Sequence, residues 1–197
     1  MLKRLFDIIF SCFGLIVTSP LIILNAILIK IDSKGPVLYK GLRVGRFGKH
    51  FKMYKFRTMV VDAENLGGPS TADDDPRITK IGRLIRKYKL DELPQLINVL
   101  KGEMSFVGPR PEVQHYVDMF TEEEEAILSV RPGITDWASL WNPDEGAILA
   151  GSPNPEQTYM EKIRPQKIKL QLKYVNERSI WKDLKIILLT LKAIVVR

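Results

Sequence analysis

The sequence predicts a membrane-associated α+β protein, in which a small globular domain, mainly helical with short strands, lies between two membrane-contacting helices. Three observations lead to this fold class. Residues 8–29 carry no formal charge, residues 34–179 alternate short strand patterns with helical stripes, and residues 180–197 are amphipathic. A chain of 197 residues has room for one domain with a real core. We therefore expect a membrane helix in 1–33, one globular unit in 34–179 and an interfacial helix in 180–197.

The uncharged run from Ile8 to Ile29 is the expected membrane segment. As a straight helix it measures roughly 33 Å, against about 30 Å for the hydrocarbon core of a bilayer. Pro20 stands near its middle and removes a backbone hydrogen bond, at a cost of roughly 3 kcal/mol in an uninterrupted helix. Ser19 can satisfy the carbonyl that the proline frees. Ser19 and Pro20 therefore mark the expected break.

The charges that flank this run predict that both of its ends face the same side of the membrane. Basic residues precede it and follow it: Lys3, Arg4, Lys30, Lys34, Lys40 and Arg43. The positive-inside rule then favours neither direction. We expect a re-entrant helix-break-helix, with a kinked ordinary span as the alternative. A cleaved signal peptide is disfavoured by the length of the run and by the lack of a small-residue cleavage site.

The middle of the chain combines short strands with two helices. Residues 37–39 begin a β-like stretch, and residues 51–59 alternate basic and apolar side chains as a strand with one charged face does. Residues 81–88 carry a helical stripe. A second helix is expected from Asp91 to about Leu100, with Pro94 tolerated in its first turn. Its expected core face is Leu93, Leu96, Ile97 and Leu100.

The C-terminal segment has the pattern of an amphipathic helix. Apolar residues recur at Trp181, Leu184, Ile187, Leu188, Leu191, Ile194 and Val195, while Lys182, Lys185 and Lys192 take another face. Such a helix suits a lipid interface, and equally a terminal helix packed on the core. The neighbouring membrane segment favours the interface.

Composition limits the classes of partner. The net charge of +7 and the pI near 9.4 call for an acidic partner: nucleic acid, an anionic bilayer or a phosphorylated substrate. Nucleic acid ranks last, because the basic residues are not interleaved with aromatic residues in a recognisable module. Cys12 is the single cysteine and permits no intramolecular disulfide. With His50 and His115 as the only histidines, a histidine-rich zinc site is disfavoured.

Asp91 and Glu92 are the candidate catalytic residues. Helix capping accounts for both on pattern alone. Their surroundings favour phosphoryl transfer, since Arg86 lies upstream and Arg110 lies in a Gly-Pro-Arg-Pro turn. One carboxylate can attack phosphorus, the other can hold Mg²⁺, and the arginines can neutralise phosphate oxygens.

A rival metal motif lies upstream. Asp73 and Asp75 form a D-x-D, the pattern that holds the metal of a nucleotide-sugar in many glycosyltransferases, which release UDP. The simpler interpretation is that Asp75 or Thr79 caps the next helix. A third alternative is a non-catalytic basic module that binds membrane or nucleotide.

Four motifs carry a resemblance to a known family: residues 55–59 (KFRTM), 90–95 (LDELPQ), 104–111 (MSFVGPRP) and 131–135 (RPGIT). From about Lys3 to the C-terminus the chain resembles the bacterial monotopic phosphoglycosyl transferases, also called polyprenyl-phosphate sugar-1-phosphate transferases. The resemblance implies a re-entrant anchor, a cytosolic catalytic domain, and a site at the cytoplasmic face of the bacterial inner membrane. It implies transfer of a sugar-1-phosphate from a UDP-sugar to polyprenyl (undecaprenyl) phosphate, as the first membrane step of surface glycan assembly.

The same resemblance assigns roles to residues. Asp91 is implied to be the nucleophile that forms an aspartyl phosphosugar and releases UMP, and Glu92 the Mg²⁺ ligand. Arg86 and Arg110 are implied to bind substrate phosphate, and the KFRTM match places Arg57 at the site. Residues 136–160 depart from the commoner family pattern, with Asp136 where many members have glycine, which leaves the sugar open. The sequence indicates no oligomeric state.

Overall fold

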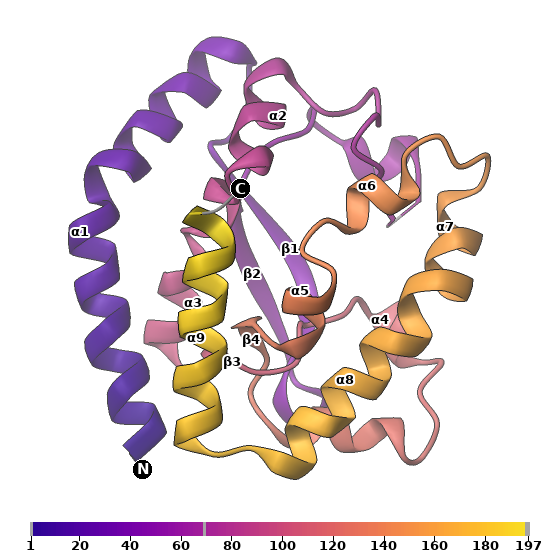
Figure 1. Cartoon of the computed structure of the whole chain (residues 1–197). Helices are drawn as coiled ribbons and strands as arrows, with labels where there is room; N and C mark the ends of the chain where they lie inside the picture. Colours follow the sequence, from indigo (N-terminus) through magenta and orange to yellow (C-terminus); the bar gives the residue numbers. More distant parts are fainter. Residues whose placement is uncertain (1, 69, 196–197) are drawn as a thin grey trace.

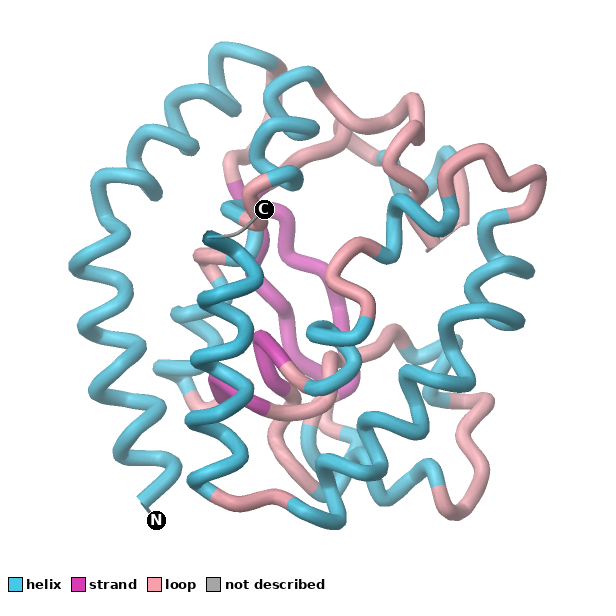
Figure 2. Tube along the Cα trace, in the orientation of Figure 1, coloured by secondary structure: helices cyan, strands magenta, loops and turns pink. Residues whose placement is uncertain are grey.

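A computed structural model describes residues 2–68 and 70–195, and the side chains of all of these except residues 194 and 195. The predicted apolar positions Ile194 and Val195 therefore lie outside the described side chains. The mixture of helices and short strands confirms the α+β class. Figure 2 shows the strands in the centre with helices around them.

Helices make up most of the described chain. The long α1 (Leu2–Asp32) runs along one side of the molecule in Figure 1, and α9 (Ile180–Val195) lies between α1 and the other helices in that view. The remaining helices are α2 (Lys80–Lys87), α3 (Gln95–Lys101), α4 (Gln114–Val117), α5 (Trp137–Trp141), α6 (Glu145–Leu149), α7 (Pro155–Thr158) and α8 (Arg164–Glu177). Short turns of 3₁₀ or π type are η1 (Arg46–Gly48), η2 (Ala63–Leu66), η3 (Leu90–Glu92), η4 (Glu124–Ser129) and η5 (Tyr159–Ile163).

Helix α1 is continuous, which corrects the predicted helix-break-helix. Every residue from Leu2 to Asp32 is helical, including Ser19 and Pro20. The Ser19 hydroxyl donates to the Ile16 carbonyl at 2.7 Å, and this is the carbonyl that the proline leaves without its usual donor. Because this bond compensates for the proline, the axis bends without an interruption (Figure 1). By length and composition α1 is able to cross a membrane.

Two small sheets lie beneath the helices. Strands β1 (Leu38–Val44) and β2 (His50–Phe56) form an antiparallel hairpin. The strand predicted over 51–59 corresponds to β2, which ends at Phe56, three residues before the predicted end. Strands β3 (Ser105–Val107) and β4 (Gly133–Thr135) form a parallel pair. The sequence did not indicate this pair, because three-residue strands are too short to show a period of two.

Helix α3 begins later than the sequence suggested. Residues 90–92 form the separate turn η3, and the helix starts at Gln95 after Pro94. Its buried face includes Val99 and the polar Asn98, while Leu100 is exposed. Leu96 is buried and Leu93 packs against the core, as predicted. The apolar stripe did not predict the buried Asn98, which binds the edge of β2 by accepting from the Tyr54 N–H and donating to the Lys52 carbonyl.

Helix α9 packs on the domain through one face and presents apolar side chains on another. Asp183 and Ile186 are buried. Trp181 is 78% exposed and Leu188 is 67% exposed. The helix therefore contacts the core and still leaves an uncovered apolar face, and its contact with lipid stays a prediction.

Candidate active site

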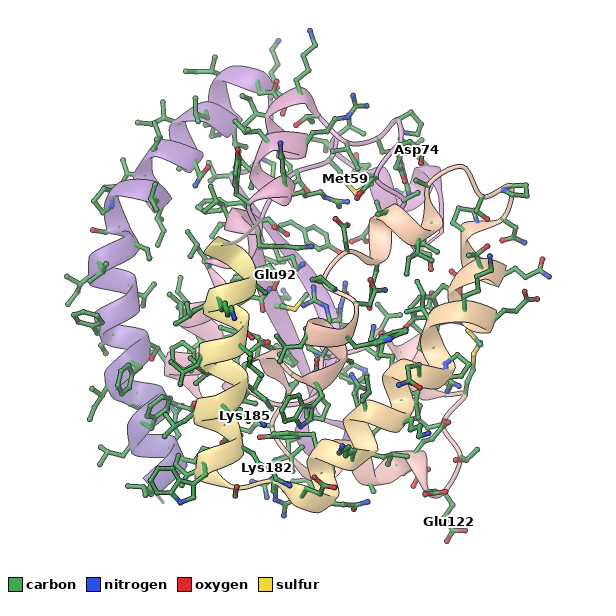
Figure 3. All side chains as sticks on the ribbon, in the orientation of Figure 1. Met59, Asp74, Glu92, Glu122, Lys182 and Lys185 are labelled. Carbon is green, nitrogen blue, oxygen red and sulfur yellow. The ribbon has the colours of Figure 1, made fainter. Side chains whose placement is uncertain are left out.

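The carboxylate pair lies in η3, between α2 and α3. Lys89 adopts a left-handed conformation (φ 55°) that ends α2 and turns the chain into η3. Asp91 is only 7% exposed. Figure 3 shows Glu92 within the ribbon, in the view that has α9 in front. Asp91 is therefore buried, and the Glu92 side chain has only limited exposure to solvent.

Glu92 is bound by two cations. Its carboxylate receives both terminal nitrogens of Arg110, Nη2 on Oε1 and Nη1 on Oε2, the latter at 3.3 Å. Lys55 Nζ lies 2.9 Å from Oε1. Burial raises the pKa of the Glu92 carboxyl, but the charges of Arg110 and Lys55 outweigh it and hold this pKa well below its ordinary value. The Glu92 charge in turn raises the pKa of Arg110.

Asp91 has a different environment from its neighbour. Its Oδ2 lies 3.4 Å from Lys55 Nζ. Its Oδ1 is buried and has no hydrogen-bond partner among the described residues, and the same is true of both amide atoms of Gln95. A buried carboxylate oxygen without a donor is unusual and costly in a folded protein. Asp91 thus differs from Glu92, whose two oxygens are both bound by cations.

Two further cations complete the surroundings. Arg86 on α2 donates from Nε to the Thr58 hydroxyl at 2.9 Å. Burial lowers the pKa of Arg86, and the charge of Asp91 opposes that shift. Burial also lowers the pKa of Lys89, while Glu92 acts in the opposite direction. The site thus concentrates positive charge around two carboxylates, as a phosphate-binding site requires.

The structure does not bring Arg57 to this site. Its guanidinium bonds the Pro36 carbonyl at 2.6 Å and the Ser33 carbonyl and hydroxyl at 3.0 and 2.8 Å. Arg57 therefore joins β2 to the end of α1. Lys55 is the basic residue of this motif that reaches the carboxylates. The alternation of side chains along a strand could not show which of Lys55 and Arg57 reaches the site. Arg57 lies just beyond the end of β2, so its side chain need not point to the face that the alternation predicts.

The D-x-D residues do not form a common site. Asp75 is bound by Arg77, through Nε at 3.0 Å and the backbone N–H at 2.9 Å. Thr79 accepts from the Gly82 N–H at 3.0 Å, which confirms the predicted helix cap. Burial and the nearby Asp144 raise the pKa of Asp73. Within the described part of the chain, no three His, Cys, Asp or Glu side chains are arranged to hold a metal ion.

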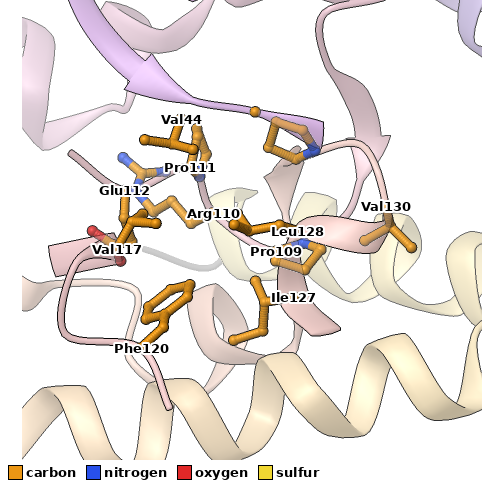
Figure 4. A pocket seen from close by; sticks show the side chains of 12 residues that line it. Val44, Pro109, Arg110, Pro111, Glu112, Val117, Phe120, Ile127, Leu128 and Val130 are labelled. Atoms are coloured by element: carbon orange, nitrogen blue, oxygen red, sulfur yellow. The ribbon is translucent and has the colours of Figure 1, made fainter. Parts of the chain in front are cut away.

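Arg110 is presented by a loop that β3 and β4 hold together. The Gly108 N–H bonds the Thr135 carbonyl at 3.1 Å, and the Gly133 N–H bonds the Pro109 carbonyl at 2.9 Å. The two glycine backbones touch, since a Cβ on Gly133 would lie 2.1 Å from the Gly108 nitrogen. The motifs at 104–111 and 131–135 therefore depend on each other. The gap beside this loop in Figure 4 measures about 10 Å³, which is too small for a substrate.

The site thus combines the carboxylates of Asp91 and Glu92 with the cations of Lys55, Arg86 and Arg110, on a chain whose long apolar helix is able to cross a membrane by length and composition. The family described as bacterial sugar transferase matches residues 1–197, and the chain belongs to this family.

Curated relatives cover almost the whole chain. It is 37% identical to the UDP-N-acetylgalactosamine-undecaprenyl-phosphate N-acetylgalactosaminephosphotransferase of Aeromonas hydrophila, over 98% of the chain and 43% of that protein. It is 40% identical to the uncharacterized sugar transferase EpsL of Bacillus subtilis, over 99% and 88%. It is 37% identical to the UDP-glucose:undecaprenyl-phosphate glucose-1-phosphate transferase of Escherichia coli, over 96% and 39%. The chain thus spans less than half the length of the Aeromonas and Escherichia relatives.

Proposed function

We propose that the protein transfers a sugar-1-phosphate from a UDP-sugar to undecaprenyl phosphate and releases UMP. The observation that carries the proposal is the buried Asp91–Glu92 pair with Lys55 and Arg110 on it. The names of the Aeromonas and Escherichia relatives support the same two substrates. The sugar itself stays open, as does the glycan that receives it.

In the first step, an oxygen of Asp91 attacks the phosphorus that carries the sugar. A new O–P bond forms, the P–O bond to UMP breaks, and UMP leaves with the electron pair. The unpartnered Oδ1 supports this assignment, because no described donor competes for its lone pairs. Arg86, Arg110 and Lys55 neutralise the charge of the phosphate oxygens and of the leaving group.

Mg²⁺ suits the donors of this site. Magnesium is usually held by one or two carboxylates together with substrate phosphates, so a larger cluster of acidic residues is not needed. The carboxylates of Asp91 and Glu92 are hard oxygen donors of the required kind, and Asp91 Oδ1 has no hydrogen-bond partner among the described residues. We assign Glu92 as the protein ligand. When bound, the ion supplies further neutralisation of the diphosphate charge.

In the second step, a phosphate oxygen of undecaprenyl phosphate attacks the same phosphorus. Its bond to Asp91 breaks, and the polyprenyl-diphosphate sugar leaves the free carboxylate behind. Two polyanions in one site would repel each other. A covalent relay on Asp91 lets the donor and the acceptor meet the cations one after the other.

The membrane arrangement that we propose is a re-entrant α1 at the cytoplasmic face of the bacterial inner membrane, where UDP-sugars are available. Both ends of α1 contact the same domain. Arg4 donates to the Val99 and Leu100 carbonyls at 2.5 and 2.7 Å, and Arg57 binds Ser33 at the other end. A helix with both ends on one domain does not place them on opposite sides of a bilayer. This supports insertion and return.

The nucleotide that is released tests the proposal. Nanodisc-held protein is incubated with Mg²⁺, undecaprenyl phosphate and a panel of UDP-sugars. We expect UMP with the correct donor, none with Asp91→Asn, and the normal amount with Asp118→Asn, an exposed matched control. Without acceptor, intact mass should increase by one sugar phosphate in the wild type only. UDP would instead indicate a metal-dependent glycosyltransferase, and UMP from Asp91→Asn would exclude Asp91 as nucleophile.

A magnesium titration tests Glu92 separately. Glu92→Gln should require a higher Mg²⁺ concentration for half-maximal rate, because the amide is a weaker ligand for a hard ion. An unchanged titration would remove the metal role. If no donor in the panel yields any nucleotide, the non-catalytic binding module becomes the better description.

A further inference from the structure

The first two turns of α1 are bound to β3 by polar groups. Asp7 is 1% exposed. Its Oδ1 accepts from the Ser105 hydroxyl at 3.0 Å and from the Phe106 N–H at 3.1 Å. Lys3 Nζ donates to the Val107 carbonyl at 3.0 Å. Helix α1 therefore holds all three residues of this strand.

These contacts take the place of a neighbouring strand. β3 pairs with β4, and no other described strand pairs with it. Buried backbone groups at such an edge need partners. Asp7 and Lys3 supply them from α1. Each of these hydrogen bonds joins one side chain to one backbone group, so α1 can take only one position along β3. Apolar packing alone would be less specific. The hydrogen bonds therefore set the register of α1 on β3.

Side chains from helices α8 and α9 also lie at the end of β3, near Val107. The Tyr174 hydroxyl lies 3.1 Å from the Val107 carbonyl and 2.7 Å from Asp183 Oδ1. Lys3 Nζ bonds the other oxygen of Asp183. The Val107 carbonyl is thus held by Lys3 of α1 and Tyr174 of α8, and Asp183 of α9 binds both of these side chains.

Strand β3 leads directly into the catalytic arginine. Val107 is three residues before Arg110, and the intervening loop is held on its other side by β4. We propose that Lys3 and Asp7 are positioning residues for Arg110: by fixing β3, the membrane helix sets the place of the Arg110 guanidinium at Glu92. This inference rests on the phosphate-binding role of Arg110 in the proposed function.

A double-mutant cycle tests the inference on the full chain in nanodiscs. The rate of UMP release in a single turnover is measured for Asp7→Ala, Arg110→Ala and the double variant. We expect Asp7→Ala to lower the rate at least about tenfold, because small misplacements of charge are costly in catalysis. In the Arg110→Ala background the same change should cost less than about twofold. Equal losses in both backgrounds would overturn the proposal.

Three controls separate positioning from general stability. Asp7→Asn keeps an acceptor oxygen and should retain the rate within about threefold. Ser11→Ala removes another buried polar group of α1, whose one side-chain hydrogen bond within the described residues goes to Ile8 of its own helix. This change should leave the rate and the melting temperature unchanged. If Asp7→Ala does not fold, Lys3→Met replaces it in the cycle, since Tyr174 still bonds Val107 there. A normal rate for Arg110→Ala alone contradicts the proposed function of Arg110 instead.

Discussion

Asp91 and Glu92 are adjacent in the chain, and their environments suit different tasks. Both oxygens of Glu92 are held in ion pairs. Asp91 has one oxygen at 3.4 Å from Lys55 and one without a described donor. A carboxylate that is held on both oxygens by cations is a well-fixed negative charge. A residue with a free oxygen is better suited to form a bond.

The depressed pKa of Glu92 predicts how stability depends on pH. Glu92→Gln leaves Arg110 and Lys55 without their partner and should cost on the order of 3 kcal/mol near neutral pH. A carboxyl whose pKa is lowered by folding stabilises the protein above its unfolded-state pKa, about 4.3, and loses that contribution as the pH falls below it. The melting temperatures of wild type and variant, measured without Mg²⁺, should therefore converge below about pH 4. A gap that is constant with pH would contradict the ion-pair account.

Lys55 and Arg57 should respond differently to substitution. Lys55→Met removes a charge that contacts both carboxylates, so kcat/KM of the folded protein should fall about 100-fold. Arg57→Met leaves the Ser33 and Pro36 carbonyls without their donor and should cost about 3 kcal/mol of stability. Its folded fraction should keep kcat/KM within about threefold. An inactive Arg57→Met with a normal melting temperature would restore the phosphate-binding role that the motif implied.

At the scale of elements, α1 is notable for a proline, Pro20, within a continuous apolar helix. Thr18 and Ser19 each donate to a carbonyl of the preceding turn, at 2.7 Å in both cases. These bonds satisfy backbone groups that lipid would not, so a proline is tolerated within the apolar run. The residues that surround Pro20 thus permit a bend while every residue remains helical.

Labelling of the ends of α1 tests the proposed re-entrant arrangement. Single cysteines replace Leu2 and Lys34 in a Cys12→Ser background, and intact cells are treated with a membrane-impermeant thiol reagent. We expect neither position to react until the cells are opened, because both ends of α1 belong to the cytoplasmic domain. Reaction at one position only would establish an ordinary span.

At the scale of the whole molecule, the exposed apolar faces of α1 and α9 give the protein a surface for lipid. Phe13 and Ile16 on α1 are 62% and 73% exposed, and Leu188 on α9 is 67% exposed. Apolar surface of this extent is rarely left uncovered in a soluble monomer. In the proposed function, the candidate site is thereby connected to the surface from which a lipid substrate would approach.

Spin labels on two helices test the lipid contact of α9. Leu188→Cys and Lys169→Cys, the latter exposed on α8, are labelled in a Cys12→Ser background and reconstituted in nanodiscs. The label at 188 should be more accessible to oxygen than to a water-soluble nickel complex, because oxygen concentrates in lipid. The label at 169 should show the opposite order. The same order at both positions would contradict an interfacial α9.

The sequence by itself determined the parts with a local or strongly periodic signal. The uncharged run gave α1 and the amphipathic pattern gave α9. The cap, expected at Asp75 or Thr79, lies at Thr79, and it could be predicted because it joins Thr79 only to Gly82, three positions further along. The motifs and the family resemblance singled out Asp91, Glu92 and Arg110, and their roles stay a prediction. Each of these features depends on neighbours along the chain, which a sequence displays directly.

Only the tertiary structure decided which charges meet. It selected Lys55 over Arg57, separated Asp75 from a metal role by pairing it with Arg77, and joined Asp7 to a strand 98 residues away. It also replaced the expected break at Pro20 by a bend, since the Ser19 bond compensates for the missing donor. Contacts between distant segments depend on the path of the whole chain, and the short strands that bring Arg110 to Glu92 leave no periodic trace in the sequence.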